Sequence, residues 1–240
     1  MTVTIMQPAY LPWLGFFDRI NLSDVFILLD NVSMDMSSKT RFNNRNKLRT
    51  PDGWVWLTIP VNTKSNHSTL INELKIVHDS NWQLKHFNAI KMNYSKSKYF
   101  KKYISFFEDL YNKNWILLVD IIDEIFYFII KELNLEKKIL KSSLLGVEGN
   151  KDDLILNLCK AIEGKTYISG PLGREYLDEK KFRDQGTEVI YHDYQHPVYD
   201  QTYKGFEPYM SVIDLLFNYG DDSLKILSSK NFKNDIQGNF

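Results

Sequence analysis

Two histidines, His192 and His196, lie in a late segment that is dense in polar and aromatic side chains (residues 191–201). A histidine titrates near neutral pH and can serve as a general acid or base. His196 is the better candidate for a base, because a proline restrains the loop behind it and Tyr199 and Gln201 stand beside it. The alternative for both histidines is a structural role, with the ring hydrogen-bonded to the backbone. Their i, i+4 spacing would align metal ligands only on a helix, so we expect no metal site.

Asp214 and His86 are candidates for supporting catalytic roles. Asp214 could orient His196, as carboxylates do in catalytic pairs, or it could belong to the cap of the helix that Ser211 begins. His86 stands four residues after Trp82 on a predicted helix and could reach a neighbouring site. A histidine satisfied on its own helix face is the alternative.

A loop stiffened by two prolines, Gln-Pro-Ala-Tyr-Leu-Pro-Trp-Leu-Gly at residues 7–15, follows the first apolar run. Gln7 offers an amide, Tyr10 a phenol and Trp13 an indole, and aromatic side chains of this kind suit sites that hold flat rings. We predict that these three side chains line a ligand pocket. The alternative is a stiff turn with a buried tyrosine and tryptophan.

Positive charge is concentrated between residues 37 and 49, which hold five cations and no acid. Four of the cations alternate along the chain and would share one face of a strand, with Asn44 facing the other way. The four are Arg41, Arg45, Lys47 and Arg49. Such a row suits a diphosphate or a carboxylate, with Asn44, Arg45 and Lys47 as the expected contacts. A solvated edge that resists aggregation is the alternative.

A glycine-containing turn, Ser169-Gly170-Pro171-Leu172-Gly173, joins a predicted strand to a predicted helix at residues 174–185. Free backbone N–H groups at such a helix start can hold a phosphate, so Ser169, Gly170 and Gly173 are candidate binding residues. The turn has neither the P-loop sequence nor the dinucleotide-binding fingerprint, and an ordinary strand-to-helix turn is the alternative.

The elements that must position these groups form an α/β pattern. Strand, loop, helix and strand within the first thirty residues indicate a βαβ unit, and alternation returns after residue 150. We predict a mostly parallel, Rossmann-like sheet in one domain (residues 1–225), with a basic β-hairpin, an inserted helical subdomain at about 79–135 and a frayed tail at 226–240. Because ligands lie beyond the carboxyl ends of parallel strands, the opening loop and the late histidine segment should share one cleft.

Composition excludes several classes of protein. The 240 residues carry 30 basic and 30 acidic side chains, so there is no long-range basic field for gripping nucleic acid. The single cysteine excludes an internal disulfide and any multi-cysteine metal site. The N-terminus lacks a signal peptide, and the longest apolar stretch (residues 115–133) contains five charged residues. We expect a cytoplasmic protein without a membrane span.

Taken together, several segments resemble the WbqC-like protein family. They are Gln7-Pro8-x-Tyr10-x-Pro12-Trp13-x-Gly15-Phe16-Phe17, Asn44-Arg45-Asn46-Lys47, Trp82-x-x-x-His86, Ile168-Ser169-Gly170, His196-Pro197-x-Tyr199-x-Gln201 and Phe206-x-Pro208-x-Met210-Ser211-x-Ile213-Asp214-Leu215-Leu216-Phe217-Asn218. The resemblance covers about residues 3–220. It implies a link to bacterial surface-polysaccharide gene clusters, notably those for the O-antigen of lipopolysaccharide.

The resemblance also suggests an activity, that of a glycine transferase. The expected enzyme is an amino-sugar N-acyltransferase that joins an amino acid to the amine of a nucleotide-linked amino sugar. An aminoacyl-tRNA donor stays open, although nucleic acid is not an expected partner. No cofactor is implied with certainty; ATP is a candidate co-substrate.

Two other functions stay open. The opening strand, proline-bearing loop and helix are similar to the start of HIGH-motif nucleotidyltransferases and adenylate-forming ligases, although the His-x-Gly-His tetrapeptide is missing. One alternative is therefore an ATP-dependent enzyme of that kind, acting on another small molecule. The other is a non-catalytic protein that binds a sugar nucleotide.

Overall fold

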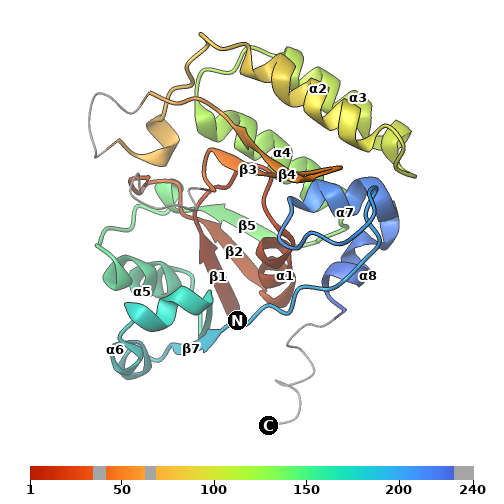
Figure 1. The fold of residues 1–240 in the computed structure, drawn as a ribbon. Coiled ribbons are helices and arrows are strands. Elements are labelled where there is room, and N and C mark those ends of the chain that lie inside the picture. Colours follow the sequence, from red (N-terminus) through yellow and green to blue (C-terminus); the bar gives the residue numbers. More distant parts are fainter. Residues whose placement is uncertain (35–41, 63–68, 230–240) are drawn as a thin grey trace.

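A five-stranded parallel sheet forms the centre of the protein (Figure 1). The computed structural model describes residues 1–34, 42–62 and 69–229. The strands lie in the order β5-β2-β1-β6-β7 and comprise β1 (Thr2–Met6), β2 (Val25–Leu28), β5 (Lys138–Lys141), β6 (Thr166–Ser169) and β7 (Glu188–Tyr191). The register pairs Val3 with Val25 on one side of β1 and with Tyr167 on the other. The predicted mostly parallel α/β fold is confirmed.

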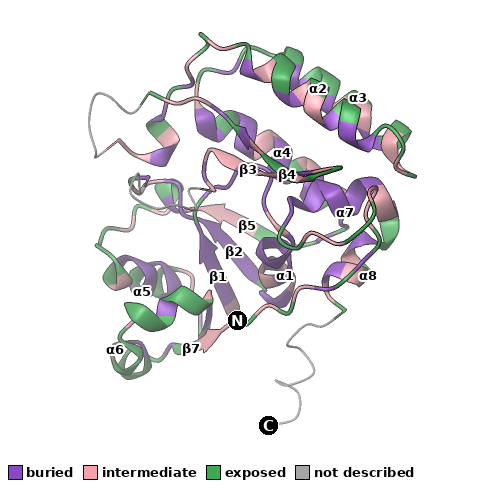
Figure 2. Ribbon diagram, viewed as in Figure 1, coloured by how far each residue is buried: buried purple, intermediate pink, exposed green. Residues whose placement is uncertain are grey.

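Each face of the sheet buries its own apolar cluster, because successive side chains of a strand point to opposite faces. On one face, Met6 and Phe26 pack toward α1 (Leu14–Leu22), α4 (Leu118–Glu132) and α7 (Val212–Tyr219). On the other face, Val3 and Ile27 pack against α5 (Asp152–Ala161) and α6 (Glu179–Asp184). Figure 2 shows the central strands buried and the outward sides of the helices exposed. No helix among the described residues is both long enough and apolar enough to cross a bilayer.

The chain between β2 and β5 contributes the predicted hairpin and helices. The hairpin consists of β3 (Arg45–Thr50) and β4 (Gly53–Thr58), which pair antiparallel. After it come α2 (Trp82–Tyr94), α3 (Phe100–Asn112) and α4, which lie over the hairpin in Figure 1. Their buried side chains, including Tyr94, Phe107 and Ile122, belong to the same cluster as α1 and α7.

The structure differs locally from the predicted elements in three places. The predicted helix at 174–185 is instead a short 3-10 helix at Pro171–Glu175 followed by α6, whose start is capped by the Asp178 side chain. The edge strand β5 was not predicted, because its two apolar residues are too few to form a strand pattern. A last helix, α8 (Ser223–Leu227), reaches into the predicted tail, of which residues 230–240 lie outside the described part.

Candidate functional site at the carboxyl edge of the sheet

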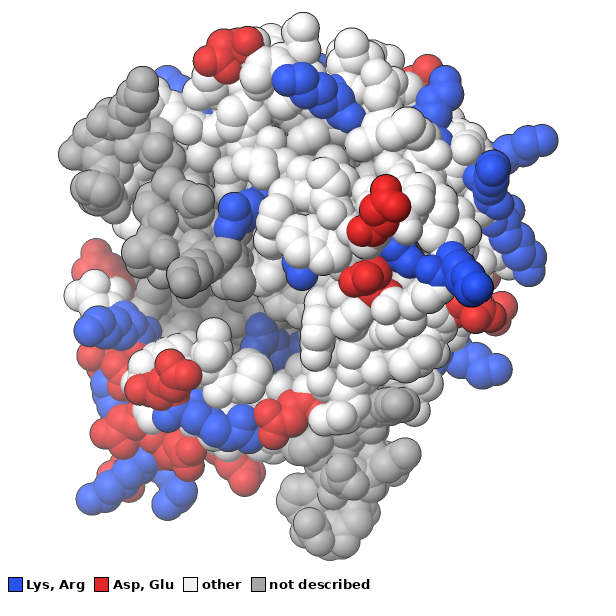
Figure 3. All heavy atoms as spheres, viewed as in Figure 1, with Lys and Arg blue, Asp and Glu red and all other residues white. Residues whose placement is uncertain are grey.

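The chain order of the sheet places a topological switch point between β1 and β6. From β1 the chain moves outward through β2, whereas from β6 it moves in the opposite direction to β7. The first connecting helix, α1, covers one face, and α5, which leads into β6, covers the other. Ligands of open parallel sheets bind beyond the carboxyl ends of the strands at such a point. Figure 3 shows that this face of the molecule is hollowed, with atoms of a basic side chain visible inside the hollow.

A buried histidine–carboxylate pair lies at this edge. His192 directly follows β7, and its backbone N–H donates to the carbonyl of Ser169 at the end of β6. Its Nε2 lies 2.7 Å from Oδ2 of Asp18 on α1, and both side chains are buried. With Nε2 facing a carboxylate, the imidazole carries its proton there and keeps Nδ1 for another partner. Oδ1 of Asp18 is buried and has no hydrogen-bond partner among the described residues.

Arg19, the neighbour of Asp18, extends over the ends of β1 and β6. Its Nε is 3.1 Å from the sulfur of Met6, the last residue of β1. Its Nη1 approaches Gly170 so closely that a Cβ on that glycine would lie 2.6 Å away. Burial lowers the pKa of the guanidinium from its ordinary range, while the phenols of Tyr167 and Tyr176 act in the opposite direction. The group nevertheless keeps its charge, because arginine is protonated at all ordinary pH values.

The predicted phosphate-binding turn, Ser169 to Gly173, lies beside this guanidinium but does not present free backbone N–H groups. Ser169 is buried, and Gly173 packs against it so tightly that a Cβ there would lie 2.1 Å from the Ser169 hydroxyl oxygen. The Gly173 N–H is already bonded to the carbonyl of Gly170, and the following 3-10 helix has only five residues. The Ser169 hydroxyl donates to the Gly170 carbonyl (3.2 Å), so the turn offers close access for the Arg19 side chain rather than free hydrogen-bonding groups.

The opening loop reaches this edge through Gln7, which is exposed. Asn43 fixes it by donating to the Gln7 side-chain oxygen (3.2 Å) and to the Pro8 carbonyl (2.7 Å). Trp13 is half-buried at the start of α1, where its ring lies 4.8 Å from that of Phe42 and its backbone pairs with Ser211. The loop is thus held by the hairpin strand and by the chain just before α7.

The loop does adjoin the late histidine segment. Tyr194 packs against Gly15, where an added Cβ would lie 2.8 Å from its ring, and the Val212 N–H donates to the Pro12 carbonyl. At the sheet edge, the late segment meets α1 through the Asp18–His192 pair rather than through His196.

His196 has both ring nitrogens engaged by the backbone. Nδ1 donates to the carbonyl of Pro197 (2.8 Å), and Nε2 accepts from the N–H of Tyr209 (3.1 Å). Burial lowers its pKa from the ordinary value. This arrangement corresponds to the structural alternative, because the lone pair that a general base would use already accepts a hydrogen bond.

Asp214, Tyr199 and Gln201 form a separate buried cluster. The Asp214 carboxylate accepts from the hydroxyls of Tyr94 (3.0 Å) and Tyr199 (2.8 Å) and from the Gln201 amide (2.9 Å). Burial raises the pKa of Asp214, and these three donors counteract that rise. The carboxylate therefore ties α7 to α2 and to the segment at 199–201, and it does not orient His196.

Tyr10 and His86 belong to another buried cluster, which lies between the opening loop, α2 and α3. The Tyr10 hydroxyl is 2.8 Å from Nδ1 of His86 and also contacts the hydroxyl of Tyr111. Burial lowers the pKa of His86 to about 3, so the ring is neutral at pH 7. These side chains anchor the opening loop to α2 and α3 and do not line the sheet edge, because their polar atoms satisfy one another in the core.

The hairpin cations stack on tryptophans. Arg45 lies 4.5 Å from the ring centre of Trp56, and Lys47 lies 4.2 Å from that of Trp54. Arg41 lies outside the described residues. Asn44 closes the hairpin through a hydrogen bond to the Ile59 carbonyl, and Asn46 donates to the Leu11 carbonyl.

Arg49, the last cation of the row, is buried and does not face a solvent-exposed anion. It donates to the Gln201 side-chain oxygen (3.1 Å) and to the carbonyls of Gly53 (2.9 Å) and Lys204 (3.1 Å), with a further bond to the Thr50 carbonyl. Its role is to join the hairpin to the late segment.

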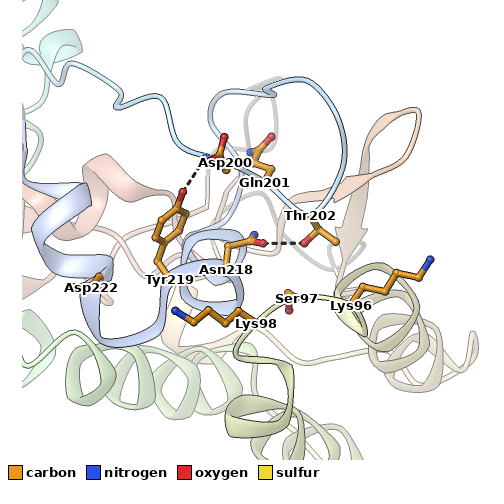
Figure 4. Close-up of a pocket in the computed structure, with 9 residues that line it drawn as sticks. All are labelled: Lys96, Ser97, Lys98, Asp200, Gln201, Thr202, Asn218, Tyr219 and Asp222. Atoms are coloured by element: carbon orange, nitrogen blue, oxygen red, sulfur yellow. Dashed lines mark hydrogen bonds between the residues drawn. The ribbon is translucent and has the colours of Figure 1, made fainter.

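Two surface cavities lie away from this edge. One of about 280 Å³ lies between the turn at Lys96–Lys98 and α7, where the Tyr219 hydroxyl accepts from the Asp200 N–H (Figure 4). The other, of about 540 Å³, is lined by residues 197–200 and by the chain around α8. Neither contains Gln7, His192 or Arg19, so we place the candidate site at the switch point on chemistry and topology rather than on cavity size.

Three residues of this site were not among the predicted site residues: Asp18, Arg19 and, as the preferred base, His192. The available signal was the position of His192 directly after a strand, which fixes it at the carboxyl edge. Among the residues that the structure describes, no group of three or more histidine, cysteine, aspartate or glutamate side chains could hold a metal ion.

Comparisons with known proteins agree with the earlier resemblance. The model of the WbqC-like protein family matches residues 7–226. An uncharacterized protein of Mycobacterium tuberculosis, Rv1507c, is 30% identical over 223 residues, which cover 92% of this chain and 95% of the relative. No solved structure matches the chain. The chain belongs to the WbqC-like protein family.

Proposed function

We propose that the protein is an enzyme of bacterial surface-polysaccharide biosynthesis that transfers an amino acid to the amine of a nucleotide-linked amino sugar. The chain belongs to the WbqC-like family, and the pathway and the choice of glycine are what the resemblance to that family implies. The observation that carries the proposal is the buried contact of 2.7 Å between His192 and Asp18, at the edge where this type of sheet binds ligands.

Amide formation needs an activated carboxyl group and a neutral amine. The amine nitrogen attacks the acyl carbonyl carbon, a C–N bond forms, and the leaving group departs with the electron pair of its broken bond. The nitrogen must also lose a proton. In the proposed reaction Nδ1 of His192 takes that proton, and Asp18 stabilises the resulting imidazolium through Nε2.

The test is a transfer assay with mass-spectrometric detection of a glycyl amide on nucleotide-linked amino sugars. Glycine with ATP, and glycyl-tRNA, serve as alternative donors. Wild-type protein should form the amide, and His192→Asn and Asp18→Asn should each reduce kcat by about 10²–10⁴ while the folded variants retain their sugar-nucleotide affinity. His78→Gln, at an exposed histidine, is the matched control and should keep wild-type activity.

Two outcomes contradict the proposal. Full turnover by a folded His192→Asn variant would exclude His192 as the general base. Failure of the wild-type protein to form an amide with either donor, despite tight binding of the sugar nucleotide, favours the non-catalytic alternative. The donors also decide the role of ATP: pyrophosphate release that depends on glycine indicates an adenylate made in place, whereas pyrophosphate release with another substrate favours the ligase alternative.

A further inference from the structure

Arg19 is a cation at the switch point, and no acidic partner for it lies within the described part of the chain. No carboxylate in residues 1–34, 42–62 or 69–229 forms an ion pair with it, although its neighbour Asp18 pairs with His192. Its hydrogen bond to described residues goes to the Met6 sulfur, which is a weak acceptor. A guanidinium has five N–H donors, so most of its capacity is left for a ligand.

The surroundings of Arg19 suit an oxyanion. Two phenols, those of Tyr167 and Tyr176, act on the Arg19 pKa in the direction that favours its charged form. Tyr176 is 53% exposed and Arg19 itself is half-buried, so neither side chain is fully enclosed by the protein. Gly170 gives the guanidinium its place, because any larger residue would displace it.

We propose that Arg19, with Tyr176 beside it, binds the diphosphate of a nucleotide at the junction of β1 and β6. A partly buried guanidinium is costly without a counter-charge, and phosphate oxygens accept its paired N–H groups with matching geometry. The choice of a sugar nucleotide as the natural ligand rests on the proposed function, whereas the anion site itself does not.

The place of Arg19 favours phosphate over the carboxylate of a free amino acid. The switch point between β1 and β6 is where doubly wound sheets hold the phosphates of nucleotides. The hairpin cations, by contrast, are stacked on Trp54 and Trp56, and the Arg49 donors are used by carbonyl and amide oxygens. Arg174 forms a bidentate ion pair with Asp193 and is therefore already neutralised.

The experiment measures binding of inorganic pyrophosphate, UDP, ADP and glycine by calorimetry, because pyrophosphate probes the anion site without any base or sugar. Wild-type protein should bind pyrophosphate and at least one nucleoside diphosphate. Arg19→Gln should weaken both at least about tenfold, the loss expected for one charge-assisted contact. Arg174→Gln is the matched control at a nearby, exposed arginine and should bind as wild type does.

A second variant keeps the test decisive if Arg19→Gln fails to fold. Gly170→Ala retains the charge but pushes Nη1 away from its place, so it should also weaken pyrophosphate binding. Unchanged pyrophosphate affinity in a folded Arg19→Gln or Gly170→Ala variant overturns the proposal. Binding of glycine by the wild-type protein without any binding of pyrophosphate overturns it as well. Because the readout is binding, a protein that binds pyrophosphate through Arg19 but makes no amide refutes the proposed function and leaves this site intact.

Discussion

The two late histidines show how the partner of a side chain decides its chemistry. His192 and His196 are four residues apart, and the ring of Tyr194 contacts both. His192 faces a carboxylate, which fixes a tautomer and can stabilise the protonated ring. His196 is bonded to the backbone through both nitrogens. At the scale of single residues, His192 is therefore suited to proton transfer and His196 to holding the loop.

His196→Gln tests this division. Because glutamine removes a ring that braces the loop but not the proposed base, we expect kcat to change less than about threefold and Tm to fall by a few degrees. The measurement is the transfer assay together with thermal unfolding. A loss of about 100-fold or more in kcat with an unchanged Tm would restore His196 as the catalytic base.

The cluster around Asp214 acts at the scale of elements, since it joins α7 to α2 and to the segment before α7. Asp214→Ala would leave three buried donors without their acceptor. We expect the free energy of unfolding to fall by about 3 kcal/mol or more, because each unsatisfied buried polar group costs about 1–3 kcal/mol. Urea unfolding measures the change.

A matched control for that experiment is Asp200→Ala. Asp200 is exposed and lies next to the same segment, so its loss should change the free energy of unfolding by less than about 0.5 kcal/mol. Equal effects of the two substitutions would contradict the structural role of Asp214.

Arg49 links the hairpin to the late segment, which makes it a second element-scale test. Arg49→Lys keeps the charge but cannot reach the Gln201 oxygen and the Gly53 and Lys204 carbonyls together. We expect a loss of about 2 kcal/mol in unfolding free energy. Lys47→Arg, two residues earlier on the same strand and stacked on Trp54, is the comparison and should be nearly neutral; a neutral Arg49→Lys would refute the linking role.

Elements with strong local patterns were predictable from sequence. The apolar runs of β1 and β2, and the turn at Pro51-Asp52-Gly53 between alternating residues, follow from local preferences. β5 was not, because its apolar pair is flanked by lysines. The pairing of Asp18 with His192 joins residues 174 positions apart, so no local pattern reports it. The row of cations on β3 was predicted from the sequence, but its contacts were not. Trp54 and Trp56 lie on the neighbouring strand β4, and Lys47 and Arg45 stack on their rings.

At the scale of the whole molecule, the polar groups that suit a ligand gather at the carboxyl edge of the sheet. On the side of the hairpin and helices, several buried polar side chains bond to one another, as Tyr10 with His86 and Asp214 with Tyr199 do. Buried polar atoms without a hydrogen-bond partner among the described residues occur on both sides, for example Trp82 Nε1 on α2 and Asp18 Oδ1 at the edge. The edge differs because it places a cation without an acidic partner among the described residues beside a buried histidine–carboxylate pair, at the topological switch point where such sheets bind ligands.

The buried, hydrogen-bonded ring of His86 makes the stability of the whole molecule depend on pH. His86 accepts from the Tyr10 hydroxyl at Nδ1, and its other nitrogen is bonded to the backbone of Thr58. Burial lowers its folded-state pKa to about 3 from 6.5 in the unfolded chain, so between these values the unfolded state binds the additional proton. The stability that neutral His86 provides is therefore complete above pH 6.5 and is lost progressively as the pH falls toward 3.

We accordingly expect acidification from pH 7.5 to pH 5 to cost about 2 kcal/mol through His86, since each pKa unit corresponds to about 1.4 kcal/mol. Urea unfolding at the two pH values measures this cost, and His86→Gln, which has no proton to gain, should flatten the difference by about that amount. His78→Gln, at an exposed histidine, should leave it unchanged. The same pH dependence in His86→Gln as in the wild-type protein would mean that this buried ring is not what limits stability in acid.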